Sequence, residues 1–279
     1  MTPAGYSTKD LARLVGVPES RVRAFVNAGF LHPRRGPGGR HRFSFPDVVL
    51  LRAAKGLREA GVSPHRVRQA LRRLHEALPA GRPLASTRIA AVGSEIVVRD
   101  AAGAWEPLSG QTLIDFEVRG LAESAAPLAR RTARNARQRA DELSAADWFE
   151  LGLDLEATAA AESRDAYRRA LEIDPRHADA HVNLGRLLHE QGQVVSAIEH
   201  YRRAIALAPD DATAHYNLAV ALEDQGQLAA ALRAYQDAIL HDPACADAHF
   251  NLAGVYEKLG KRAAALRHLK TYRELVRGS

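Results

Sequence analysis

A five-residue phrase occurs three times in the C-terminal part of this 279-residue sequence, and it constrains the fold more than any other feature. The copies begin at Ala180, Ala214 and Ala248, so successive copies lie 34 residues apart. Each copy reads Ala-His, then Val, Tyr or Phe, then Asn-Leu. A constant period of this length is typical of a repeat array, in which each unit buries its apolar face only against its neighbours.

Further positions follow the same period. They are Gly192, Gly226 and Gly260, then Ala197, Ala231 and Ala265, and finally Pro209 and Pro243. Glycine marks a turn and proline a helix end, so each unit is predicted to be a helix, a turn, a second helix and a stop. The alanines are expected where two helices approach too closely for a larger side chain.

This pattern resembles the tetratricopeptide repeat (TPR). Three units fit it in full, at 178–211, 212–245 and 246–279. A degenerate unit precedes them, with Trp148 and Leu151 on its first helix and Ser163 where the other units have alanine. The resemblance implies a right-handed α-solenoid over residues 144–279, with the first helix of each unit on the concave side.

Charge is distributed unevenly along the chain. Residues 1–82 contain 16 Lys and Arg against 5 Asp and Glu, residues 83–143 contain 8 against 8, and residues 144–279 contain 15 against 20. The three segments therefore carry net charges of +11, 0 and −5. A basic head on an acidic body indicates a polyanionic partner for the head alone.

The head, residues 1–82, is predicted to contain a helix-turn-helix. The capping-box pattern from Ser7 to Asp10 opens a short helix, and Gly16 makes the turn. A second helix begins at Pro18, and its outward positions include Arg21, Arg23 and Asn27. Such a second helix is free to enter the major groove of DNA.

A glycine-rich tip with arginines on both sides follows the second helix. Arg34 and Arg35 precede the tip, and Arg40 and Arg42 follow it. This composition predicts a small β-hairpin wing that lies against DNA phosphates.

The head resembles the DNA-binding domain of the mercury-resistance-regulator (MerR) family. The matching segments are Tyr6-Ser7, Val15-Gly16-Val17, Val22-Arg23, Ala28-Gly29-Phe30-Leu31, Arg40-His41-Arg42-Phe43 and Gly61-Val62-Ser63. The resemblance implies DNA contacts by Arg23 and the wing arginines, and a homodimer on a pseudo-palindromic promoter site. Ala24 and Phe25 stand where the family usually has two tyrosines. The full set of expected DNA contacts is Arg21, Arg23, Asn27, Arg34, Arg35, Arg40 and Arg42.

Residues 83–120 form an insert of short strand-forming runs separated by turn residues. They predict a small antiparallel meander with Trp105 and Phe116 in its core. The sequence leaves open whether this sheet is a dimer contact or a packing spacer. Residues 121–143 carry alanines at heptad spacing, surrounded by arginines, and we interpret them as a basic helical linker in preference to a coiled coil.

The sequence offers no catalytic or metal-binding pattern. His181, His215 and His249 recur once per repeat on stacked helices, so they cannot share one ion, and packing is the expected role. The single cysteine excludes a disulfide framework and favours a cytoplasmic location. No phosphate-binding loop, nucleophile elbow, membrane span or secretory segment is recognisable. We therefore expect no catalytic residues, metal or cofactor.

The concave side of the array is the expected binding surface for a protein or peptide. An amide side chain pairs with both groups of a peptide backbone, so Asn183, Asn217 and Asn251 form a ladder for an extended segment. The alternative is that these asparagines only bond the neighbouring repeat. The candidate groove residues are Asn183, Arg186, Tyr216, Asn217, Phe250 and Asn251.

Together these features predict a mainly α fold: a winged helix-turn-helix head, a small antiparallel β insert and a C-terminal TPR α-solenoid. The predicted function is a cytoplasmic transcriptional regulator that binds double-stranded DNA through its head and a protein partner through its groove, without enzymatic activity or membrane attachment. The alternative is a TPR adaptor whose head no longer binds DNA. The +11 head favours the regulator.

Overall fold

A computed structural model describes residues 5–36, 39–77, 87–92, 95–100 and 112–277. The chain divides into two compact units, Met1–Ala166 and Tyr167–Ser279. The fold is mainly α, as predicted, with small antiparallel strands in the first unit. No helix in the described part of the chain is both long and apolar enough to cross a bilayer.

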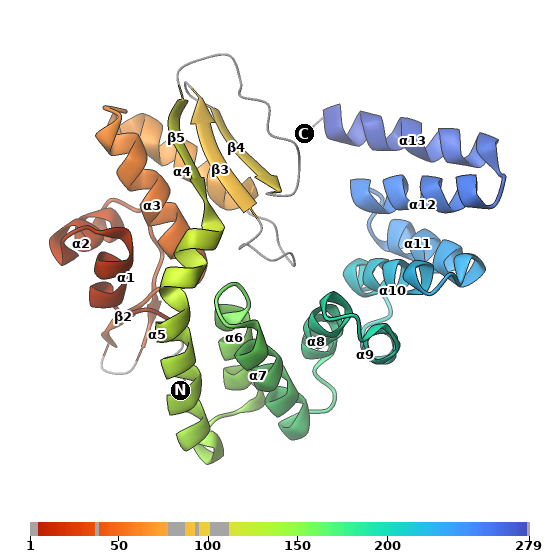
Figure 1. The fold of residues 1–279 in the computed structure, drawn as a ribbon, viewed down its shortest axis with the longest axis horizontal. Helices are drawn as coiled ribbons and strands as arrows, with labels where there is room; N and C mark the ends of the chain where they lie inside the picture. Colours follow the sequence, from red (N-terminus) through yellow and green to blue (C-terminus); the bar gives the residue numbers. More distant parts are fainter. Residues whose placement is uncertain (1–4, 37–38, 78–86, 93–94, 101–111, 278–279) are drawn as a thin grey trace. The chain divides into compact units, whose positions relative to one another are not determined.

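The first unit contains the predicted winged helix-turn-helix (Figure 1). Its helices are α1 (Thr8–Val15), α2 (Glu19–Asn27), α3 (Phe45–Glu59) and α4 (Pro64–Ala77), and its hairpin is formed by β1 (Arg34–Arg35) and β2 (His41–Arg42). In the hairpin Arg34 pairs with Arg42 and Arg35 with His41. The order of elements is the one expected from the sequence.

Local side-chain bonds fix where the head helices begin and end. At α1 the Ser7 hydroxyl accepts from the Asp10 N–H, and the Asp10 carboxylate accepts from the Ser7 N–H. Ser44 and Asp47 form the same reciprocal pair at α3. Gly16 ends α1 with φ +69°, a left-handed conformation that suits glycine.

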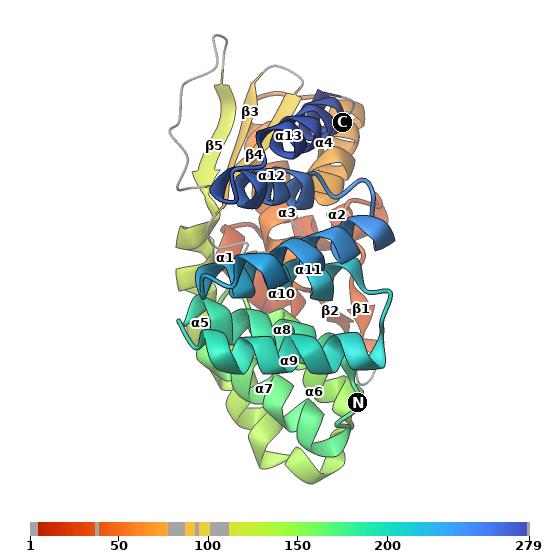
Figure 2. The same cartoon turned by 90° about the vertical axis from the view of Figure 1, so that its right-hand side faces the viewer.

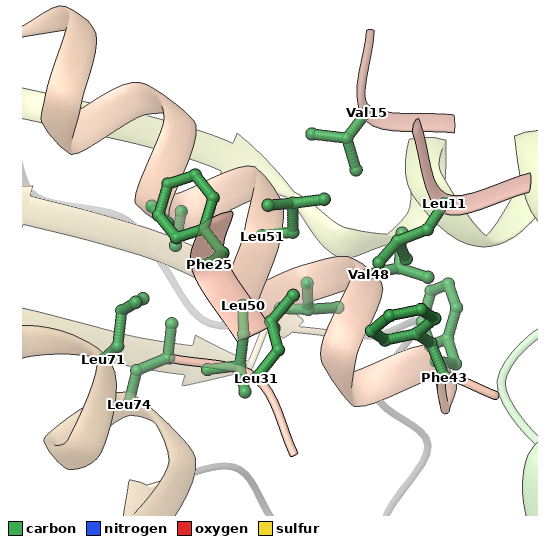
Figure 3. Close-up of a cluster of buried hydrophobic side chains, with 14 of the residues drawn as sticks. Leu11, Val15, Phe25, Leu31, Phe43, Val48, Leu50, Leu51, Leu71 and Leu74 are labelled. Carbon is green, nitrogen blue, oxygen red and sulfur yellow. The ribbon is translucent and has the colours of Figure 1, made fainter. Parts of the chain in front are cut away.

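The four head helices bury a common apolar core (Figure 3). Leu11 from α1, Phe25 from α2, Leu51 from α3 and Leu74 from α4 converge in it, and each is at most 6% exposed. Burial of a side chain of this size contributes about 1.5–3 kcal/mol. This core holds α2 against the rest of the head through Val22 and Phe25.

The insert forms a three-stranded antiparallel sheet of β3 (Thr87–Val92), β4 (Glu95–Asp100) and β5 (Thr112–Glu117). The strand order is β4-β3-β5, so the prediction of a meander was wrong, because β5 pairs with β3 instead of β4. Ile89, Ala90 and Ala91 of β3 are buried, as suits a central strand with a partner strand on each side. Trp105 lies outside the described residues, whereas Phe116 pairs with Ile89 and packs on the head core.

Helix α5 (Val118–Gln138) follows β5 directly and differs from the linker expected at 121–143. Val118, Ala122, Ala125 and Leu128 are buried in the core of the head. The small alanines let α5 lie close to its neighbours, so its apolar seam is covered within the first unit. The helix therefore belongs to the packed head and does not serve as a spacer alone.

The helices of the degenerate repeat are α6 (Ala145–Leu155) and α7 (Ala160–Ile173). Ser163, which replaces the usual alanine, is fully buried and donates its hydroxyl to the Gly152 carbonyl at 2.8 Å. The boundary between the compact units falls inside α7, so α6 belongs to the first unit. The reason is that α6 contacts α5 and its Glu150 pairs with Arg34 of the wing.

The three full repeats form successive antiparallel helix pairs (Figure 2). The pairs are α8 (Ala178–Glu190) with α9 (Val194–Leu207), α10 (Ala212–Asp224) with α11 (Leu228–His241), and α12 (Ala246–Lys258) with α13 (Arg262–Arg277). The alanines at 197, 231 and 265 are at most 1% exposed, as their predicted place between helices requires. Glycines at 192, 226 and 260 turn the chain with φ of +73° to +75°.

One histidine per repeat closes the loop before its own helix pair. The Nε2 atoms of His181, His215 and His249 lie 3.1, 2.9 and 3.3 Å from the carbonyl oxygens of the prolines at 175, 209 and 243. A carbonyl only accepts, so each Nε2 carries the proton and donates it. These histidines are buried parts of the repeat scaffold.

Candidate nucleic-acid interface

Helix α2 presents its polar residues on the surface of the head. Arg21, Arg23 and Asn27 are exposed, whereas Val22 and Phe25 of the same helix are buried. Arg23 bonds Glu19, one turn earlier, at 3.2 Å, and 65% of its side chain is exposed. Exposed pairs of this kind contribute at most about 1 kcal/mol, so the guanidinium is readily redirected to another anion.

The wing presents Arg35 and Arg40 to solvent. Arg35 donates to the Gly39 carbonyl at 3.3 Å, which holds its side chain across the hairpin tip. Arg42 is half-buried, and its stem lies against Gly36, where an added Cβ would be only 2.8 Å from the Arg42 Cγ. Glycine at 36 is therefore needed to let the hairpin close around the Arg42 stem.

Arg34 differs from the other wing arginines because it forms an ion pair with Glu150 of α6. Asp154, one turn further along α6, belongs to the same charged group. Burial raises the pKa of Asp154 to about 7, the Arg34 charge partly opposes this rise, and Glu150 and Asp47 add to it. Glu150 and Asp154 were not predicted from the sequence. The feature that could have indicated them is a pair of carboxylates one helical turn apart.

Two of the three groove asparagines contact neighbouring helices. Asn183 donates to the Tyr167 hydroxyl at 3.4 Å, and Asn251 donates to the Tyr216 hydroxyl at 3.1 Å. Among the residues that the structure describes, no hydrogen bond joins the half-buried Asn217 side chain to a neighbour. The ladder therefore has one open amide, between two that also bond the scaffold.

Aromatic rings and a hydrogen-bonded charged group lie near these asparagines. The Tyr216 ring lies 6.0 Å from that of Tyr235, and Phe250 is 52% exposed. Glu223 accepts from the Tyr235 hydroxyl at 2.9 Å and from Lys258 at 2.7 Å. Apolar and amide groups thus alternate on the first helices, an arrangement that suits an extended peptide.

Arg186, also expected in the groove, is mostly buried. It is 9% exposed and bonds Glu190 of its own helix at 2.7 Å. Among the described residues no group of three or more His, Cys, Asp or Glu side chains is arranged to hold a metal ion.

A winged helix-turn-helix with a basic wing, followed by an array of paired helices, defines the class of this chain. Residues 6–74 match the MerR HTH family of regulatory proteins. Residues 166–199 and 216–279 match tetratricopeptide repeats, and residues 185–226 match a TPR repeat. The chain is thus a fusion of a MerR-family helix-turn-helix domain with TPR repeats.

Two solved structures are similar to part of this chain. One, described as a crystal structure of MamA, is 22% identical, with a TM-score of 0.51 over 57% of this chain and 95% of that chain. Another, MamA 41-end from Desulfovibrio magneticus RS-1, is 22% identical, with a TM-score of 0.49 over 58% of this chain and 94% of that chain. At this identity the first likeness shows the fold alone. A search of curated proteins gave no match.

Proposed function

We propose that this protein is a DNA-binding transcriptional regulator. The observation that carries the proposal is the set of exposed arginines on α2 and on the wing, in a head with a net charge of +11. A repeat scaffold alone gives no reason to concentrate arginine on these two elements. A helix in the major groove and a wing on the phosphates use both sets of arginines.

The roles within the head follow from position. Arg21, Arg23 and Asn27 lie on the helix expected in the groove, where arginine reads guanine and asparagine reads adenine. Arg35, Arg40 and Arg42 lie on the wing, where arginine pairs with phosphates and fixes the register of the head. Arg34 joins them when its pair with Glu150 opens. In this proposal the protein acts as a cytoplasmic homodimer on a pseudo-palindromic site.

The array supplies the second interaction, a protein partner in the concave groove. Asn217 is the central contact, because its amide makes no bond to the scaffold among the described residues. Tyr216 and Phe250 offer apolar surface beside it, and the −5 charge of residues 144–279 disfavours an acidic partner. Asn183, Arg186 and Asn251 complete the groove.

The decisive experiment measures DNA binding by the full chain. Genomic fragments captured by the protein are sequenced, and the affinity for the enriched site is then measured between low and high salt. Five to eight phosphate contacts give a log–log slope of about −4 to −7, since each contributes about −0.9. Arg23→Ala is expected to weaken the enriched site by about 1–3 kcal/mol.

Arg72→Ala is the matched control, because Arg72 is an exposed arginine of the same head on α4. Its loss should be small. Equal losses for the two variants would show that α2 does not enter the groove. Failure to enrich any DNA, with the array folded, would favour the adaptor.

A further inference from the structure

The second unit contains a cavity that plays no part in the proposed function. It is largely open to solvent, measures about 580 Å³ and lies between α7, α8 and α9. Its apolar wall includes Leu171, Leu184 and Leu207, and none of the groove residues lines it. A volume of this size is in the range that holds small organic ligands.

The polar part of the wall contains two arginines, Arg168 and Arg203, and two histidines, His181 and His200. The one lining carboxylate, Glu172, already bonds Arg169 at 2.8 Å. Among the described residues Arg203 has no carboxylate within ion-pair distance. The cavity therefore has an excess of positive charge and an arginine without a protein anion.

The two histidines form a bonded pair whose protons can be assigned. His181 donates its Nε2 proton to the Pro175 carbonyl, so in the neutral ring its Nδ1 atom accepts. His200 Nδ1 lies 2.8 Å away and donates to it. Burial, together with the charges of His181, Arg203 and Arg168, lowers the pKa of His200 to about 4.

The neighbouring repeats show that the fold does not require this set of residues. One repeat later, the positions of Arg168, His200 and Arg203 hold Arg202, Ala234 and Asp237. Two repeats later they hold Gln236, His268 and Thr271. The histidine pair recurs there, with His249 and His268 Nδ1 atoms 3.0 Å apart, but neither of the two equivalent positions holds an arginine. The fold of a unit therefore does not require Arg203, because Asp237 and Thr271 take its place in the later units.

We propose that this cavity binds a small organic oxyanion, a phosphate or carboxylate carried on an apolar body. The anionic group pairs with Arg203 and Arg168, because a guanidinium offers paired donors that match both kinds of oxyanion. The apolar body packs against Leu171, Leu184 and Leu207. This site lies outside the helix-turn-helix and the groove, and the inference does not depend on the proposed function.

The test is calorimetric titration of the full chain with phenyl phosphate, benzoate and phenol. We expect phenyl phosphate or benzoate to bind with a Kd on the order of 1 mM or tighter, and phenol, which has the ring without the charge, to bind at least about tenfold more weakly. Whichever oxyanion binds more tightly identifies the preferred group. Equal binding of phenol, or no heat from either anion, would overturn the proposal.

Two variants on one helix locate the site. Arg203→Thr introduces the residue that the third full unit carries at this position, and it should weaken the anion about tenfold or more. Arg202→Thr removes the same charge from the adjacent residue, which is equally exposed but does not line the cavity, and should leave the affinity within about twofold. Equal effects of the two variants would mean that the anion is attracted only by the overall positive charge, which would contradict a specific site. If a thermal melt shows that Arg203→Thr is unfolded, Arg203→Gln replaces it with the same expected loss.

Discussion

Gly185 is the residue at which the repeat has the least space. A Cβ added there would lie 2.7 Å from Cε1 of the buried Tyr201, although the two later units carry alanine at this position. We expect Gly185→Ala to destabilise the array by about 1–3 kcal/mol, because overpacking outweighs the gain of up to about 1 kcal/mol in helix propensity. Urea unfolding of the full chain, followed by circular dichroism, measures the change.

Gly254→Ala is the matched control for this substitution. Gly254 also lies within a first helix, α12, but nothing stands within 4 Å of an added Cβ. The change should therefore stabilise the array by about 0.5–1 kcal/mol. A stabilising effect at both positions would mean that Tyr201 moves aside at no cost.

At the scale of elements, α6 places Asp154 in the charged group beside the wing. The folded pKa of Asp154 is raised from 3.8 to about 7, so the folded state holds the proton more tightly than the unfolded state does. Stability is therefore lost as pH rises from about 4 to about 7. Asp154→Asn, which is neutral at every pH, should leave the melting temperature unchanged near pH 4 and raise it above pH 7, by a free energy on the order of a few kcal/mol at most.

Melting curves across this pH range check the expectation. Asp141→Asn, an exposed change in the turn before α6, should show no such growth with pH. A gain for Asp154→Asn that is already complete at pH 4 would contradict the raised pKa and point to a packing effect.

Elements whose ends are fixed by neighbouring residues could be predicted from the sequence. The capping boxes at Ser7 and Ser44 and the 34-residue period gave the head helices and the repeat units, because each signal acts over a few residues. The order of the insert strands could not, since β3 pairs with β5 across an intervening segment and no local signal selects that partner. A simple reversal of the chain would pair β5 with β4, the strand before it, and the predicted meander assumed that pairing.

The same distinction applies to the candidate sites, where local spacing predicts some residues and only tertiary packing reveals the others. Exposure of Arg21 and Arg23 on α2 follows from helical spacing next to the buried Val22 and Phe25. The pair between Arg34 and Glu150 joins residues 116 positions apart, so only tertiary packing reveals it. The bonds that Asn183 and Asn251 make to tyrosines likewise depend on how the helices stack.

At the scale of the whole molecule, a substitution in the groove of the array should weaken its protein partner without changing DNA binding by the head. Asn217→Ala is expected to weaken the groove partner by about 1–3 kcal/mol, because the amide groups of the bound chain would lose their bonds. DNA affinity and the melting temperature should not change. Recovery of the partner after cross-linking to the full chain, measured beside DNA binding, tests both statements.

Asn251→Ala provides the contrast, since it breaks the bond to Tyr216 within the array. It should lower the melting temperature, whereas Asn217→Ala should not. Ala231→Leu should unfold the array, because Ala231 is fully buried between helices. If Asn217→Ala melts the array as Asn251→Ala does, the asparagines serve the scaffold and not a ligand.

Strand β5 runs directly into helix α5, so the register of the sheet and the rotation of the helix about its axis depend on each other. Glu117 ends the strand and Val118 begins the helix, with no loop between them. A slip of one residue along β3 would exchange the two faces of β5, and the same step along α5 corresponds to a turn of about 100°. That turn would carry Ala122 and Ala125 away from the head core. The alanines of the helix therefore also specify the register of the sheet, since a misregistered strand would deliver a helix with its apolar seam facing water.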